Sequence, residues 1–190
     1  MVNYTLFSNN PEMLERFGKY SKITGVIFLI IGLAGIFWPV LMSVTTAIFV
    51  GWLFVFSGIM IGWHTWKTNP KDWLGWFKTV IFFLTGLFIV IHPFPGVAAL
   101  GLLFAIYFLL DTFASTALAF TMRPEKHWWI ALLNGILSLA IAIFFLIGWP
   151  FSSLWMVGLL VGISLFFDGV LLLSLGSAAG KEQKDTSAKA

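Results

Sequence analysis

The chain has 190 residues, of which 59% are hydrophobic and 10% are charged, and its mean hydropathy is +0.96. A soluble domain of this length cannot withdraw so much apolar surface from water, because a folded chain keeps much of its surface exposed to solvent. The absence of cysteine excludes disulfides, thiolate chemistry and sulfur-ligated metals. The composition therefore predicts an integral membrane protein.

The first part of the chain, residues 1–22, is polar and mixed in charge, without the apolar segment and cleavage site of a signal peptide. We interpret it as a cytoplasmic lead-in and expect the first membrane helix to act as an uncleaved signal. Asn10 and Pro11 match a helix start, because Asn caps helices and Pro suits the first helical position. The residues that follow form either a short interfacial helix or a frayed end.

Three long segments, 23–63, 79–122 and 128–180, contain no Lys or Arg. Each is about twice the ~20 residues that one helix needs to cross a bilayer. A turn divides each segment at a proline, namely Pro39, Pro93 and Pro150. We therefore predict an all-α membrane protein with six transmembrane helices, at residues 23–37, 44–63, 73–91, 97–120, 128–147 and 154–175. The small, polar tail, residues 176–190, is expected to be disordered and cytoplasmic.

The six helices repeat as three tandem two-helix hairpins, at residues 23–66, 73–120 and 128–175. Eighteen residues after each proline stands a small or acidic residue: Ser57, Asp111 and Asp168. Glycines at packing positions recur through the helices, where they let backbones approach one another. These glycines are Gly25, Gly32, Gly51, Gly58, Gly135, Gly162 and Gly169.

Charge placement predicts the orientation of the chain. All eleven Lys and Arg residues fall on the side shared by both termini, and the three proline turns carry none. Because cytoplasmic loops are enriched in Lys and Arg, both termini should be cytoplasmic. The basic pI of about 9.3 then reflects topology and attraction to anionic lipid. We expect the lipid bilayer as a partner and no nucleic acid, since no nucleic-acid-binding module is recognisable.

The threefold pattern Gly-x6-Gly-x6-Pro, followed by a helix ending in Ser-Gly or Asp-Gly, resembles the HdeD family of bacterial acid-resistance membrane proteins. The resemblance covers about residues 20–176. The second repeat departs most, with Thr79, Ala105 and Thr112 where glycine is expected. The resemblance implies a multi-pass protein of the bacterial inner membrane linked to acid stress. It supplies no catalytic residues, ligand or cofactor, and it leaves open a homo-oligomer or a membrane or periplasmic stress-protein partner.

Asp111 and Asp168 are the residues of greatest chemical interest. A carboxylate within the membrane is costly unless it is paired, hydrated or protonated. At a similar depth, Lys78 could reach toward Asp111, and Asn134 could hydrogen-bond Asp168. A pseudo-threefold axis would bring Ser57, Asp111 and Asp168 into one ring. Other Ser and Thr hydroxyls within the helices are expected to bond a carbonyl one turn back.

Two interpretations of these acids remain open. In one, they tie neighbouring helices together; in the other, they form a proton-responsive site, because burial disfavours the charged form of a carboxyl group. His92, beside Pro93, is either a sensor of external pH or an ordinary interfacial turn residue.

Catalysis is the function class that the sequence favours least. The Gly-x-Gly-Asp context of intramembrane aspartyl proteases surrounds neither acid, and no metal-ligand spacing or Ser/His pair is recognisable. We therefore predict a non-enzymatic membrane stress protein without catalytic, cofactor-binding or metal-binding residues. The alternative is a small proton-coupled transporter or channel. A closed, glycine-packed core would favour the first function, and a continuous polar path would favour the second.

Overall fold

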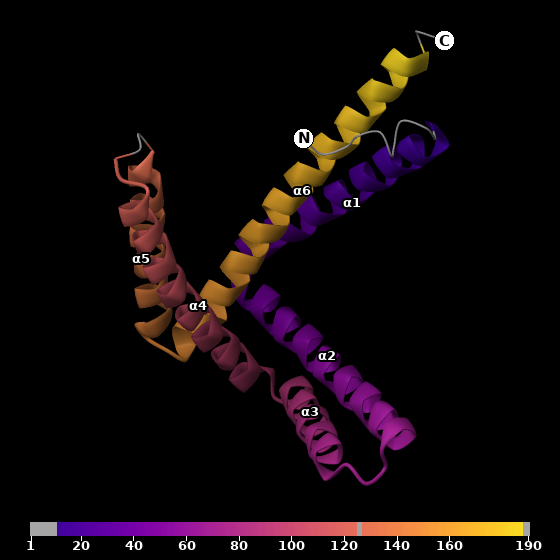
Figure 1. Ribbon diagram of the computed structural model, residues 1–190, viewed down its shortest axis with the longest axis vertical. Coiled ribbons are helices and arrows are strands. Elements are labelled where there is room, and N and C mark those ends of the chain that lie inside the picture. Colours follow the sequence, from indigo (N-terminus) through magenta and orange to yellow (C-terminus); the bar gives the residue numbers. More distant parts are fainter. Residues whose placement is uncertain (1–10, 125–126, 188–190) are drawn as a thin grey trace. The chain divides into compact units, whose positions relative to one another are not determined.

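Helices account for most of the chain in the computed structural model, which describes residues 11–124 and 127–187 (Figure 1). Within these residues the helices are α1 (Pro11–Phe37), α2 (Pro39–Thr68), α3 (Trp73–Ile91), α4 (Pro93–Thr121), α5 (Trp128–Leu146) and α6 (Phe151–Ser187). All six are long and apolar enough to cross a membrane. The expected all-helical, multi-pass class is confirmed at this level.

Four of the helices, α1, α2, α4 and α6, begin earlier than expected, and proline explains two of the differences. Pro39 and Pro93 occupy the first positions of α2 and α4 rather than the turns before them. Proline suits this position, because its fixed φ is helical and its missing N–H would have no partner there. Only Trp38 and His92 separate the helices on either side. Before α6, Gly148 adopts a φ of 78°, which glycine tolerates without a steric cost.

The two ends of the helical region also extend further than expected. α1 runs without interruption from Pro11, so the predicted lead-in is helical over its described part, whereas residues 1–10 lie outside the described residues. α6 continues to Ser187, and the expectation of a disordered tail from residue 176 is wrong as far as that residue. Ala, Lys, Glu and Gln make up half of residues 176–187, and all four are good helix formers.

The chain divides into two compact units. The first contains α1 and most of α6, and the second, Pro39–Leu159, contains α2 to α5 and the first turns of α6. Within the first unit, α1 and α6 pack backbone against backbone. A Cβ atom on Gly25 would lie 2.9 Å from the carbonyl oxygen of Gly169, and one on Gly162 would lie 2.8 Å from the carbonyl carbon of Gly35.

Within the second unit, α2 packs along α3 and α4 packs along α5. A Cβ atom on Gly86 would lie 2.6 Å from the carbonyl oxygen of Gly51, and one on Gly58 would lie 2.7 Å from the backbone nitrogen of Phe83. The interface of α3 with α4, which formed one expected hairpin, is much smaller. The closest packing in this unit therefore joins helices of neighbouring sequence repeats.

The helix pairs use matching positions of the repeat. Gly32 and Gly86 each stand seven residues before a proline, and Gly51 and Gly162 each stand twelve residues after one. Gly86 contacts Gly51 between α3 and α2, and Gly32 contacts Gly162 between α1 and α6. In α5 and α4 the related residues are Ala142, which stands eight residues before Pro150, and Ala105, which stands twelve residues after Pro93; they are 0% and 1% exposed. One packing register thus serves all three pairs.

Candidate functional site

Four polar side chains meet between α4 and α5, and we name them the α4–α5 polar cluster: Asp111, Ser115, Asn134 and Ser138. Ser138 Oγ donates a 2.5 Å hydrogen bond to Asp111 Oδ2, which also accepts from Asn134 Nδ2 at 3.2 Å. Asn134 Nδ2 donates to Ser115 Oγ at 2.9 Å, and Ser115 Oγ in turn donates to Asp111 Oδ1 at 3.4 Å. The carboxyl group therefore receives donors from both helices.

Helical spacing explains how the cluster forms. Ser115 follows Asp111 by four residues, and Ser138 follows Asn134 by four, so each helix presents two polar groups on one face. Ser115 and Ser138 are 9% and 4% exposed, whereas Asp111 is half-buried and Asn134 is exposed.

Among the expected partners of the aspartates, Asn134 bonds Asp111. Its expected bond to Asp168, which belongs to the other unit, stays a prediction. Lys78 is an exposed residue of α3, and the hydrogen bonds of the Asp111 side chain go to residues of α4 and α5. Ser115 and Ser138 were missed, although their four-residue spacing from Asp111 and Asn134 was a signal that could have found them.

The proposed ring of Ser57, Asp111 and Asp168 stays a prediction. Ser57 is half-buried on α2, in the same unit as Asp111. Asp168 is exposed on the part of α6 that belongs to the other unit. Its neighbour Gly169 faces α1, since a Cβ atom there would lie 2.7 Å from the backbone nitrogen of Leu29.

A groove of about 430 Å³ adjoins the polar cluster between the last turns of α4 and the first turns of α5. Ser115 and Asn134 belong both to the cluster and to the groove wall. The remaining lining residues are Leu118, Met122, His127, Ile130 and Ala131. The groove thus combines a mainly apolar wall with one polar end.

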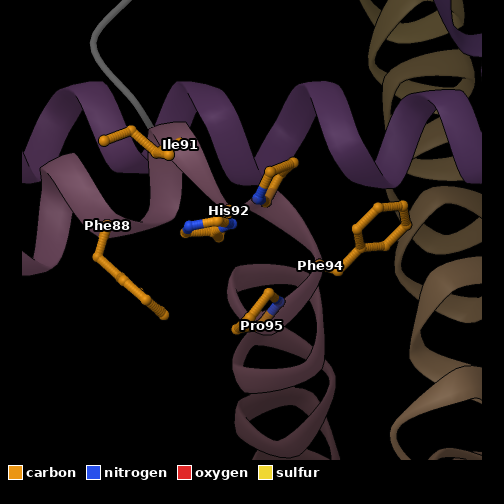
Figure 2. Close-up of a pocket in the computed structure, with 6 residues that line it drawn as sticks. Phe88, Ile91, His92, Phe94 and Pro95 are labelled. Atoms are coloured by element: carbon orange, nitrogen blue, oxygen red, sulfur yellow. The ribbon is translucent and has the colours of Figure 1, made fainter.

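His92 lies at the turn between α3 and α4, where it precedes Pro93. Its backbone N–H donates a 2.8 Å hydrogen bond to the Phe88 carbonyl oxygen, and its ring centroid lies 5.5 Å from that of Phe88. It lines an open pocket of about 510 Å³, whose other lining residues are apolar (Figure 2). Either earlier interpretation of His92, as a sensor or as a turn residue, fits this exposed position.

The first turns of α2, α4 and α6 meet in the second unit, and we name this contact the helix-start junction. Ser43 Oγ donates to the carbonyl oxygens of Pro39 and Leu154, at 3.0 and 2.5 Å. A Cβ atom on Gly101 would lie 2.5 Å from Ser153 Cβ, and one on Gly96 would lie 3.5 Å from Ala47 Cβ. The side chains that are 0% exposed in this region are Ser43, Ala47, Val97, Ser153 and Val157. Small residues therefore close the junction.

No group of three or more His, Asp or Glu residues within the described parts of the chain could hold a metal ion. One buried polar atom there, Ser153 Oγ, has no hydrogen-bond partner. It sits against Gly101 at the helix-start junction, where the close approach of α4 and α6 leaves little room. The α4–α5 polar cluster is therefore the candidate functional site, because its side chains hydrogen-bond one another across two helices.

Comparison with known proteins identifies the family. The model of a short repeat of unknown function (DUF308) matches residues 23–81 and again 77–147. The protein HdeD of Escherichia coli K12, that of Escherichia coli O157:H7 and that of Shigella flexneri are each 27% identical to the chain, over 94% of its length and 96% of theirs. No solved structure matches. The expected HdeD resemblance and internal repetition are therefore confirmed, and the chain belongs to the DUF308 short-repeat family as an HdeD-like, multi-pass membrane protein.

Proposed function

We propose that this protein is a non-enzymatic scaffold of the bacterial inner membrane that contributes to survival under acid stress. In this proposal both termini are cytoplasmic, and the intramembrane aspartates serve helix packing. The acid-stress role rests on the family resemblance. Copies of the chain or a second stress protein would assemble on the scaffold within the lipid bilayer.

The closed helix-start junction is the observation that carries the scaffold role. A transporter or channel needs a polar path through its helices, with groups that replace water around the moving ion. At the junction, the first turns of α2, α4 and α6 instead bury Ser43, Val97 and Ser153 completely. Two of these are polar, but Ser43 is satisfied by helix carbonyls. Such a contact favours a packed scaffold over a conduit.

The α4–α5 polar cluster supports the same role. Hydrogen bonds across transmembrane helices hold them together, with measured contributions of roughly 0.6 kcal/mol on average. Asp111 collects donors from both α4 and α5, and Ser138 is nearly inaccessible. The cluster therefore acts as a link between two neighbouring repeats.

Proton flux tests this function directly. The purified protein would be placed in liposomes loaded with a pH-sensitive dye, under an acid-outside gradient, beside protein-free liposomes and the double variant Asp111→Asn/Asp168→Asn. A scaffold gives no flux above that of empty liposomes in either form. Flux in the natural protein that collapses in the double variant would instead establish a conducting site and reverse the proposal.

Acid survival tests the physiological part of the proposal. A strain lacking the gene would be exposed to acid with and without a plasmid copy, and viable cells would be counted. We expect the natural copy to restore survival and Gly158→Val, which forces a side chain against the Pro39 carbonyl at the junction, to restore less of it. Equal survival with and without the plasmid would reject the acid-stress role while leaving the scaffold architecture untouched.

A further inference from the structure

All four matching positions are polar at one of the three helix interfaces, where the side chains hydrogen-bond one another. The positions occupied by the α4–α5 polar cluster have counterparts at the same places of the repeat in the other two helix pairs. These counterparts are Ser57, Ile61, Lys78 and Phe82 in the pair of α2 with α3, and Asp168, Leu172, Thr24 and Phe28 in the pair of α6 with α1. Because each of the other pairs uses the same register with two polar and two apolar residues at these places, packing alone does not require four hydrogen-bonding groups at one interface.

The cluster can be reached from the surface of the protein. The groove between α4 and α5 ends at Ser115 and Asn134, and Asp111 lies one hydrogen bond behind both. His127 stands at its other end, seven residues before Asn134. At 1.5 Å per residue, this separation corresponds to about 10 Å along α5.

The charge of the site selects a cation. Asp111 is the acidic group, and its hydrogen bonds come from neutral Asn and Ser side chains. The guanidinium group of Arg123, beyond the end of α4, lies over the Trp128 ring, 4.1 Å from its centroid. A carboxylate at membrane depth is stabilised by a positive partner, and it repels anions.

The shape of the groove selects the kind of cation. Leu118, Met122, Ile130 and Ala131 form an apolar wall suited to a hydrocarbon chain. A primary ammonium group has three donors and no acceptor, and the inner end is lined by Ser115 and Asn134, with the Asp111 carboxyl group one hydrogen bond behind them. A hydrocarbon tail with an ammonium head matches both ends of the groove.

We propose that the groove between α4 and α5 binds a primary alkylammonium group, with its hydrocarbon part on the apolar wall and its ammonium group at the α4–α5 polar cluster. The group would come from a free amphiphilic amine, because the polar cluster is the membrane-deep end of the groove; an aminophospholipid, whose ammonium group lies at the membrane surface, would have to enter in the reverse direction and is the other outcome of the test. This site goes beyond the scaffold function and is independent of the acid-stress role, because it concerns binding alone.

Hexylamine, which is an ammonium ion at neutral pH, is a suitable probe. The full-length protein would be placed in nanodiscs of phosphatidylcholine, which lacks a primary amine, and titrated by calorimetry with hexylamine and, separately, with hexanol. We expect saturable binding of hexylamine and none of hexanol. Asp111→Asn should weaken hexylamine binding about tenfold or more, since it removes a charge-assisted hydrogen bond.

Two further variants separate binding from folding. Ala131→Phe fills the apolar wall without touching the polar cluster, and it should abolish binding while thermal unfolding stays close to that of the natural protein. Ser57→Ala changes the matching position of α2 and should leave the affinity unchanged. Equal binding of hexanol, or full affinity in both Asp111→Asn and Ala131→Phe, would overturn the proposal.

The lipid composition of the nanodiscs distinguishes the two sources of the amine. If aminophospholipid occupies the groove, replacing part of the phosphatidylcholine by phosphatidylethanolamine should raise the apparent dissociation constant of hexylamine several-fold by competition. An unchanged constant would identify a free amine as the ligand. Both results require saturable binding in pure phosphatidylcholine, whose absence contradicts the site in either form.

Discussion

At the scale of single residues, the bond between Ser138 and Asp111 is the one whose removal should be most informative. Ser138→Ala should lower the free energy of unfolding by about 1 kcal/mol, within the range measured for hydrogen bonds between membrane helices. Unfolding in mixed micelles of increasing denaturing detergent would measure the change. The matched control is Ser57→Ala, at the counterpart of Asp111 in α2, which should change stability little.

A double-mutant cycle on Ser138 and Asp111 tests the same hydrogen bond more directly. Because Ser138 and Asp111 share one hydrogen bond, the double variant Ser138→Ala/Asp111→Asn should cost less than the sum of the single changes. Independent, additive losses would show that the two side chains do not interact in the membrane.

Sequence reasoning found Asp111 and Asn134 but assigned them different partners. Depth along a helix can be estimated from sequence, whereas the neighbouring helix depends on packing between distant segments. Hydroxyls were expected to bond carbonyls one turn back, and Thr45, Thr79 and Thr112 do so. Ser115 and Ser138 depart from that rule, because an acidic group lies within reach of each.

At the scale of helices, the backbone contact of Gly86 should tolerate a methyl group poorly. A Cβ atom there would lie 2.6 Å from both the Gly51 carbonyl oxygen and the Val55 backbone nitrogen, so α2 and α3 must move apart. Gly86→Ala should therefore destabilise the protein by about 1–3 kcal/mol despite the better helix propensity of alanine. Detergent unfolding of the purified variant would measure the loss.

Gly62 is the matched control in the same pair of helices. Its added Cβ would mainly meet the Cγ2 atom of Thr79, at 2.9 Å, and a side chain moves more easily than a backbone. Gly62→Ala should thus cost less than Gly86→Ala. The reverse order would indicate that α2 and α3 are not packed in this register.

The six hydrophobic spans could be predicted because each is long and strongly apolar, with Lys78 as the one basic residue in the predicted ranges. Their partners could not, since glycine spacing marks a packing face without naming the helix that covers it. Gly51 and Gly86 were both recognisable as packing residues, yet their contact with each other depends on the pairing of α2 with α3. The early helix starts at Pro39 and Pro93 were missed because a proline between two apolar runs is equally compatible with a turn.

At the scale of the whole molecule, the three helix pairs share a packing register but differ in the number of polar residues at matching positions. The pairs of α1 with α6, α3 with α2 and α5 with α4 share a register, although their sequences differ at most positions. A fold built from such helix pairs needs small residues only where the two helices touch, and the remaining positions are free to change. The polar residues of α4 and α5 can therefore specialise without loss of the common architecture.

The membrane orientation of the whole molecule can be tested with single introduced cysteines, because the natural chain has none. Single cysteines would be introduced by Phe94→Cys, at the turn between α3 and α4, and by Thr68→Cys, at the end of α2; both positions are exposed. Lys67 and Lys71 flank Thr68, whereas the other turn has no basic residue, so the positive-inside rule puts Phe94 outside and Thr68 in the cytoplasm. A membrane-impermeant maleimide should label Phe94→Cys in intact spheroplasts and Thr68→Cys only after permeabilisation. The opposite pattern would invert the topology, and the groove between α4 and α5, which lies near the ends of the helices on the side of Thr68 in this topology, would then face the periplasm.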